Sequence, residues 1–160
     1  MLPATVDRDA RIAQYRETAR ALADAGVELI LCESFVAPDE LALAVATCGE
    51  LGVPCWAAIV PREDGDCLGG AAIERVLELE VELVAVHCCS LIAADAALAR
   101  LRAAAPERML AAYPSTAADD DGFARALVTI AVRHGLAWVG ACCGSTPATI
   151  AALRRALDHG

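Results

Sequence analysis

Short apolar runs alternate along the chain with longer segments in which apolar residues recur at helical spacing. The apolar runs have the length and continuity of strands buried on both faces, which is typical of parallel sheets. They cover residues 27–32, 54–60, 81–88, 109–113 and 136–140. The segments predicted to be helical cover residues 7–25, 38–52, 68–80, 91–104, 121–134 and 147–157. Five strands alternating with six helices predict one α/β domain with a parallel sheet. The alternation does not distinguish an open doubly wound sheet from part of a barrel.

Composition narrows the class of protein. The 160 residues suffice for one sizeable core, and no apolar run approaches the roughly 20 residues of a membrane-spanning helix. The net charge of −9, the acidic run 119–121 and the lack of a basic cluster argue against a nucleic-acid partner. The N-terminus lacks a basic region followed by an apolar stretch. We therefore expect no secretory signal, no membrane partner and a cytoplasmic location.

The cysteines carry the candidate chemistry, since the chain has eight of them in apolar, strand-like contexts. Cys142 and Cys143 lie in a glycine-flanked turn between a strand and a helix predicted to begin after Thr146. Adjacent cysteines are poorly suited to a disulfide with each other, so we expect them to be ligands of one site. A third soft ligand is available at Cys88 or Cys89, of which only one can face a given side of a strand. The remaining cysteines, Cys32, Cys48, Cys55 and Cys67, are expected to be small buried hydrophobic residues.

The stretch Gly-Ala-Cys-Cys-Gly-Ser-Thr-Pro-Ala-Thr-Ile at 140–150 resembles the Gly-Gly-Cys-Cys-Gly-Thr-x-Pro-x-His-Ile signature of the homocysteine S-methyltransferases. Val86-His87-Cys88 resembles the family's Val-Asn-Cys strand end, and Leu31-Cys32-Glu33-Ser34 its Leu-x-Glu-Thr motif. The resemblance implies a partial (β/α)8 TIM barrel with about five parallel strands and six helices. It makes residues 1–160 a single domain that lacks the family's first three βα units.

The resemblance also implies a reaction and a site. Cys88, Cys142 and Cys143 would hold Zn²⁺, with Cys89 as the fallback for Cys88. The homocysteine thiol would take the fourth position and accept a methyl group from an unidentified small donor, forming methionine. Glu33 would contact the amino group of homocysteine, with Ser34 beside it. His87 stands where the family has asparagine, and it could contact substrate, contact a ligand thiolate or simply pack.

Two alternatives to methyl transfer remain open. The chain could be a catalytically inactive zinc-binding barrel remnant or an interaction module. A thiol-redox role is disfavoured because neither cysteine pair has the Cys-x-x-Cys spacing. An open five-stranded sheet would expose unpaired backbone, so we expect a homo-oligomer or a complementing N-terminal barrel piece to cover its edge.

Overall fold

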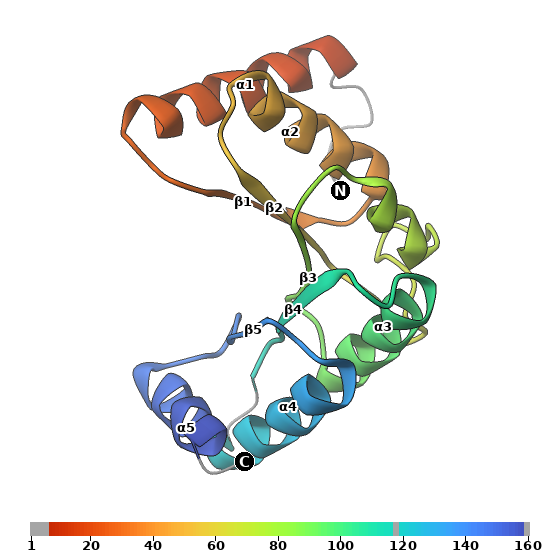
Figure 1. Cartoon of the computed structure of the whole chain (residues 1–160), viewed down its shortest axis with the longest axis vertical. Helices are drawn as coiled ribbons and strands as arrows, with labels where there is room; N and C mark the ends of the chain where they lie inside the picture. The colour runs from red at the N-terminus through yellow and green to blue at the C-terminus, as the bar shows by residue number, and fades with distance from the viewer. Residues whose placement is uncertain (1–6, 117–118, 159–160) are drawn as a thin grey trace.

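The chain folds into a curved parallel sheet with its helices on the outer, convex side (Figure 1). The structure is a computed structural model that describes residues 7–116 and 119–158. The elements in chain order are α1 (Arg8–Asp24), β1 (Ile30–Phe35), α2 (Pro38–Glu50), β2 (Cys55–Ile59), the 3-10 helix η1 (Ile73–Glu78), β3 (Leu83–His87), α3 (Leu91–Ala104), β4 (Met109–Tyr113), α4 (Asp120–His134), β5 (Trp138–Val139) and α5 (Pro147–Asp158). The prediction that the chain has no secretory signal rests on its N-terminus, of which the first six residues lie outside the described residues.

The order of the strands distinguishes the two architectures that the alternation left open. The sheet order is β1-β2-β3-β4-β5, and every neighbouring pair is parallel. A doubly wound sheet reverses its strand order and carries helices on both faces, whereas a (β/α)8 barrel adds each strand beside the last with helices outside. The structure confirms the α/β prediction and shows an incomplete (β/α)8 barrel. No helix within the described ranges is both long and apolar enough to cross a bilayer.

The first strand begins later than the apolar run at 27–32 predicts. Gly26 adopts a φ of +81°, and the Val27 N–H still donates to the Leu22 carbonyl of α1. These residues therefore finish the helix C-terminus, and pairing with β2 starts only at Ile30, opposite Cys55. The strand also ends later than predicted: β1 extends to Phe35 and contains residues 33 and 34.

The helix predicted over 68–80 is wrong, because only the 3-10 turn η1 forms there. Gly69 donates its N–H to the Val36 carbonyl so closely that an added Cβ would lie 2.7 Å from that oxygen. Gly70 has a φ of +90°, which a right-handed helix cannot include. The two glycines therefore hold an irregular loop after β2 in place of the first helical turns.

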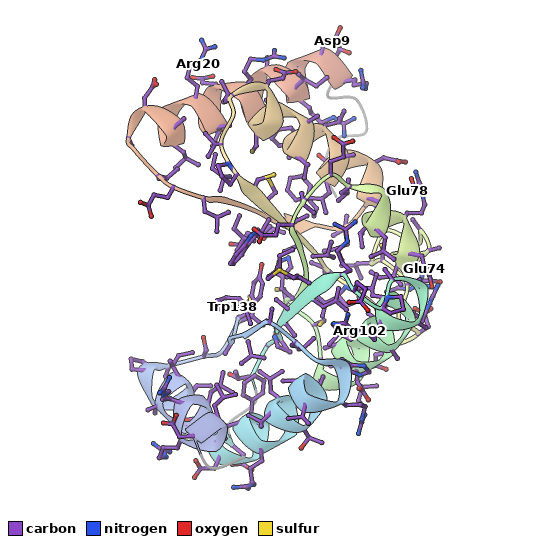
Figure 2. All side chains as sticks on the ribbon, viewed as in Figure 1. Asp9, Arg20, Glu74, Glu78, Arg102 and Trp138 are labelled. Carbon is purple, nitrogen blue, oxygen red and sulfur yellow. The ribbon has the colours of Figure 1, made fainter. Side chains whose placement is uncertain are left out.

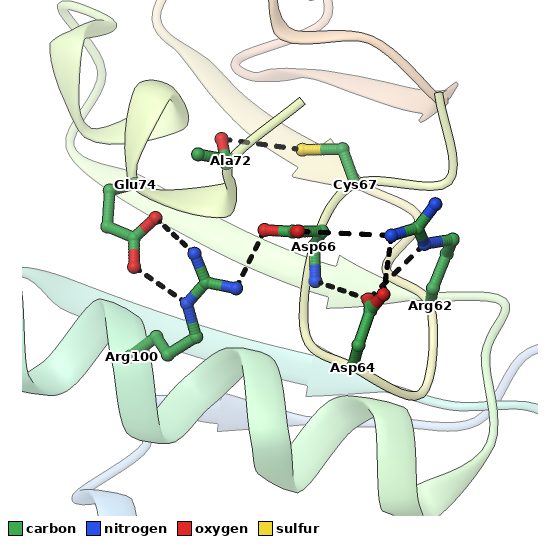
Figure 3. A network of polar contacts seen from close by, with 7 residues as sticks. All are labelled: Arg62, Asp64, Asp66, Cys67, Ala72, Glu74 and Arg100. Atoms are coloured by element: carbon green, nitrogen blue, oxygen red, sulfur yellow. Dashed lines mark hydrogen bonds and ion pairs between the residues drawn. The ribbon is translucent and has the colours of Figure 1, made fainter. Parts of the chain in front are cut away.

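That loop is held against α3 by one arginine (Figure 3). Arg100 donates two hydrogen bonds of 2.7 Å to the Glu74 carboxylate and one of 2.7 Å to Asp66. The bidentate contact lowers the pKa of the Glu74 carboxyl. Gly65 lies against the backbone of α3, where a Cβ would be 3.2 Å from the Ala96 carbonyl carbon. This network fixes the connection between β2 and η1, which contains no α-helix.

The strands separate two cores. Side chains on the outer face pack against the helices in the larger core, which includes Ile59, Val84, Val86, Leu98, Leu110 and Leu127. The inner face carries a smaller cluster of Ala58, Leu83, Ala85, Ala111 and Tyr113, with Leu31 and Trp56 against it. Period-two alternation along parallel strands produces this division. The inner face leads to the carboxyl ends of the strands, where barrel active sites are built.

An ion pair between α3 and α4 gives the fold a pH dependence. Asp95 accepts hydrogen bonds of 2.6 Å from both His134 and Arg133, and these contacts, His134 first, lower the pKa of the Asp95 carboxyl. A depressed carboxyl pKa stabilises the fold above the unfolded pKa of about 3.9, and this contribution is lost as the pH falls through the folded pKa. We expect Asp95→Asn to be less stable than the wild type at pH 7 by under about 1 kcal/mol, since the pair is partly solvated. Urea unfolding from pH 7 to pH 3 should show this difference shrink below about pH 4. A constant difference would contradict this assignment.

Candidate functional site

The cysteine turn after β5 is tied to the segment that follows β4. Cys142 donates its N–H to the Pro114 carbonyl at 2.8 Å, and the Thr116 N–H donates to the Cys143 carbonyl at 2.8 Å. The ladder between β4 and β5 thus continues past the strand ends. Gly144 then reverses the chain with a φ of +82°, a conformation that favours glycine. These bonds fix both cysteines relative to β4.

The helix start predicted at Thr146 and Pro147 is confirmed. α5 begins at Pro147. The Thr146 hydroxyl oxygen accepts from the N–H groups of Ala148 at 3.2 Å and Thr149 at 3.4 Å. This cap satisfies orphaned donors of the first helical turn. The paired cysteines therefore lie between a strand end and a capped helix N-terminus.

Three sulfur atoms meet at the carboxyl ends of β3 and β5. Cys143 Sγ lies 3.6 Å from Cys88 Sγ and 4.0 Å from Cys142 Sγ. Cys88 Sγ and Cys142 Sγ lie within 4.8 Å of each other. Three thiolates bound tetrahedrally to zinc at about 2.3 Å would have sulfurs about 3.8 Å apart. The three sulfurs therefore fit zinc with small side-chain adjustments. Of the three cysteines, Cys143 is exposed to solvent.

The structure separates the two adjacent cysteines that follow β3. Cys88 adopts a φ of +52°, which strains a residue with a side chain and turns the chain before α3. Its sulfur lies on the side of Cys142 and Cys143, whereas Cys89 is buried at 7% exposure in the outer core. The Ser90 hydroxyl then caps α3 by accepting from the Ala93 N–H at 3.1 Å. Of the two candidates, the geometry places Cys88 with the paired cysteines.

His87 is buried beside these sulfurs and is 1% exposed. Its Nε2 accepts a hydrogen bond of 3.0 Å from the Ser34 N–H, and its ring stacks on Tyr113 with centroids 4.9 Å apart. Burial lowers the pKa of His87, so the ring is neutral and carries its proton on Nδ1. Nδ1 is buried and has no hydrogen-bond partner among the described residues. One ring nitrogen lies within 4.8 Å of the sulfurs of Cys88 and Cys142.

Residues from β1 complete the site. The β1–β2 register shifts between Cys32 and Phe35, and Ser34 within this irregularity has a φ of +70°. This turns the Ser34 N–H toward His87. The preceding Glu33 accepts a hydrogen bond of 3.1 Å from the Tyr113 hydroxyl. Burial, followed by the charge of Glu33, raises the pKa of Tyr113, so the phenol remains a donor.

These contacts bring all six residues expected at the site together: Glu33, Ser34, His87, Cys88, Cys142 and Cys143. Tyr113 was not predicted to take part, although it connects Glu33 to His87. Its one sequence signal was a phenol at a strand end in a chain with 4% aromatic residues. Trp138, on the inner face of β5, packs edge-on against Tyr113 at 5.6 Å and remains 44% exposed (Figure 2).

A groove of about 540 Å³ adjoins Cys88. It lies where α3 and α4 begin, and its lining includes Ser115, Thr116, Asp119 and Phe123. Serine and threonine hydroxyls and one carboxylate make its polar lining. The groove provides space for a small molecule beside Cys88.

Comparison with known proteins shows which family and fold the chain resembles. The family model described as homocysteine S-methyltransferase matches residues 2–157. No match was found among curated proteins. Among solved structures, the chain resembles the apo form of the homocysteine methyltransferase MmuM from Escherichia coli, with a TM-score of 0.82 and 25% identity. That match covers 96% of this chain and 58% of the other, so the chain spans less than two thirds of its relative.

More distant matches show the fold alone. The catalytic domain of a hyperthermophilic chitinase from Pyrococcus furiosus has a TM-score of 0.63 and 13% identity, covering 99% of this chain and 68% of that one. The carboxyl transferase domain of Rhizobium etli pyruvate carboxylase has a TM-score of 0.57 and 21% identity, covering 81% and 23%. The match of the family model over nearly the whole chain shows that this protein belongs to the homocysteine S-methyltransferase family.

Proposed function

We propose that this chain transfers a methyl group from an activated small-molecule donor to the thiol of homocysteine, forming methionine, with Zn²⁺ held by Cys88, Cys142 and Cys143. The observation that carries the proposal is that three sulfurs meet at the carboxyl ends of barrel strands. The sulfur of Cys143 lies 3.6 Å from that of Cys88 and 4.0 Å from that of Cys142. Three thiolate ligands leave one tetrahedral position open, which is typical of catalytic zinc sites. The three thiols must stay reduced, which supports the proposed cytoplasmic location.

When bound, zinc would keep the substrate sulfur in its thiolate form at neutral pH. The methyl transfer itself is a displacement: a sulfur–carbon bond forms while the bond from the methyl carbon to the donor breaks. The donor leaves with that electron pair, and the thiol proton passes to solvent. The protein's task is then to orient the thiol toward the methyl carbon and to limit water at the reacting atoms.

Glu33 is the proposed partner of the substrate's ammonium group. Its carboxylate is exposed at the end of β1 and is held at one oxygen by the Tyr113 hydroxyl. The other oxygen remains available for a charge-assisted hydrogen bond. The Ser34 N–H and the His87 ring fix this part of β1 to β3. The buried Nδ1–H of His87 is proposed to face a site thiolate or the substrate, since a buried donor without a partner is costly.

The activity assay tests the function directly. The reduced 160-residue chain with zinc should form methionine from homocysteine when given a panel of methylated sulfonium, ammonium and methylfolate donors. Chelation should abolish the reaction, and Cys67→Ala, which changes a cysteine outside the site, should retain it. Zinc binding without methionine from any donor would support the alternative of an inactive zinc-binding remnant and contradict the proposed reaction.

Substitution of Glu33 tests the substrate contact. We expect Glu33→Gln to raise the KM for homocysteine about 10- to 100-fold with a smaller change in kcat, because a hydrogen bond to a charged group contributes about 1.5–3 kcal/mol. Tyr113→Phe should raise KM less, since it removes only the group that orients the carboxylate. Glu82→Gln, on an exposed residue just before β3, is the matched control. Equal KM values for Glu33→Gln and the control would refute the assigned contact.

We also propose that the inner face and sheet edges are covered by a second copy of the chain or by a complementing N-terminal barrel piece. The support is the 44% exposure of Trp138 and the free pairing edges of β1 and β5 in the described sheet. Sedimentation should show a dimer or larger species of the purified chain, or a complex with an N-terminal barrel piece when that piece is added. The expectation would be contradicted if the chain stayed monomeric both alone and after addition of candidate N-terminal pieces, and melted in one sharp transition.

A further inference from the structure

A second group of three sulfurs lies on the outer face of the sheet, away from the candidate active site. Cys32 on β1 and Cys55 on β2 point to the same outer side, because Ile30 pairs with Cys55 and Cys32 pairs with Ala57. Cys48 reaches them from the last turn of α2. Cys32 Sγ and Cys48 Sγ are 3.8 Å apart, and all three sulfurs lie within 4.8 Å of one another.

This arrangement differs from ordinary packing of a buried cysteine. Cys67 shows the ordinary case: it is fully buried, and its sulfur faces the Ala72 carbonyl oxygen at 3.9 Å (Figure 3). Cys32, Cys48 and Cys55 instead come from three elements and converge on one point. A metal–sulfur bond of about 2.3 Å places three sulfurs about 4.0 Å apart around a planar three-coordinate ion. The 3.8 Å contact between Cys32 Sγ and Cys48 Sγ is close to this spacing, and the coordination geometry is decided by the number of available ligands.

The surroundings of the three sulfurs narrow the class of ion. Cys32 and Cys48 are 7% and 2% exposed, and the group contains no imidazole or carboxylate among the described residues. Hard cations need oxygen ligands, and zinc normally takes a fourth ligand. A soft monovalent d10 cation accepts thiolates alone and has weak geometric demands. Three converging sulfurs with no other metal-binding side chain in the described group therefore fit copper(I) best.

A cavity adjoins two of these three cysteines. A cavity of about 300 Å³ is lined by Cys32 and Cys48, and Tyr15, Ala19 and Leu22 of α1 lie on its other side. The cavity therefore brings open space to two of the three cysteines on the α1 side of β1. The cavity makes the site loadable in the folded protein, in contrast to a metal bound only during folding.

We propose that Cys32, Cys48 and Cys55 form a second metal site that binds a soft d10 cation, with copper(I) as the matching ion. Binding replaces thiol protons, which pass to solvent, and no electron is transferred. The site is independent of the proposed methyl transfer. The two groups of cysteines share no residue, so each can be removed alone.

The test is an anaerobic copper(I) titration of the full chain against a chromophoric copper(I) chelator. The triple variant Cys88→Ser, Cys142→Ser, Cys143→Ser removes the other thiol site and should still bind one copper(I) tightly. X-ray absorption of that complex should show three sulfur neighbours at about 2.3 Å. Adding Cys48→Ala should weaken binding by more than the roughly 10- to 100-fold that losing an outer-shell partner costs. Adding Cys67→Ala should change nothing.

Folding of each variant is checked by circular dichroism. Should the triple variant fail to fold, the wild type and Cys48→Ala provide the same comparison, since Cys48→Ala should lose one equivalent of copper and Cys67→Ala none. The absence of tight copper on a folded, reduced triple variant would overturn the proposal. So would equal copper stoichiometry in the wild type and a folded Cys48→Ala.

Discussion

Cys142→Ser should lose about one equivalent of tightly bound zinc per chain relative to the wild type, both purified under reducing conditions. Cys142 supplies one of three sulfurs. The separations of Cys143 Sγ from Cys88 Sγ and Cys142 Sγ, 3.6 and 4.0 Å, match a tetrahedral site. A serine hydroxyl is not ionised at neutral pH and is a poor replacement for a soft thiolate. Two remaining sulfurs would hold zinc weakly, so the loss should be nearly complete. Elemental analysis after gel filtration measures it.

Two controls separate this effect from general changes in thiol content. Cys67→Ala removes a buried thiol and should retain the wild-type zinc content. Cys48→Ala alters the outer sulfur group and should retain the equivalent that Cys142→Ser loses. If Cys142→Ser held as much zinc as the wild type, the paired cysteines would not be ligands, and the proposed reaction would lose its basis.

Gly144→Ala should destabilise the fold by about 2–3 kcal/mol and displace the paired cysteines. Gly144 has a φ of +82°, where an L-residue costs about 1–2 kcal/mol. In addition, an alanine Cβ would lie 2.9 Å from the Thr116 carbonyl oxygen and 3.0 Å from its hydroxyl. That backbone is held by the Cys143 carbonyl, so it cannot move without moving the cysteine turn. Urea unfolding measures the stability, and zinc content reports on the turn.

Gly135→Ala is the matched control for this substitution. Gly135 ends α4 with a φ of +59°, and an added Cβ would meet nothing within 4 Å. It should therefore lose only the conformational cost of about 1–2 kcal/mol and retain its zinc. If both variants were equally destabilised and both retained zinc, the contact with Thr116 would have no role in holding the turn.

Much of the fold could be predicted because each element is encoded locally. The α3 and β4 bounds match the predicted segments 91–104 and 109–113, since the serine cap and the apolar run mark them in sequence. The loop at 68–72 could not be predicted from helical spacing, because Gly69 is fixed by the Val36 carbonyl from a distant segment. Local periodicity contains no information about that contact.

In the candidate site, too, the parts encoded by a local motif could be predicted, and the parts that depend on contacts between distant residues could not. The motif around Cys142 and Cys143 predicted the turn, and the resemblance predicted Glu33 and Cys88 as further site residues. The role of Tyr113 depends on a contact with Glu33, 80 residues away, that sequence spacing cannot reveal. Cys32, Cys48 and Cys55 were predicted to be small buried hydrophobic residues; Cys32 and Cys48 are buried, Cys55 is half-buried, and the β1–β2 register and the last turn of α2 place their sulfurs together.

The strand order also has a consequence for how the chain folds. Each strand pairs with the next strand in sequence, so the sheet can grow one strand at a time, each pairing closing a single connection. The bonds from Ser34 to His87 and from Tyr113 to Glu33 instead span 53 and 80 residues. They can form only after the intervening strands have curved into place. The hydrogen bonds among the residues that we assign to the reaction therefore form late in folding. Their formation indicates that the whole sheet has been completed.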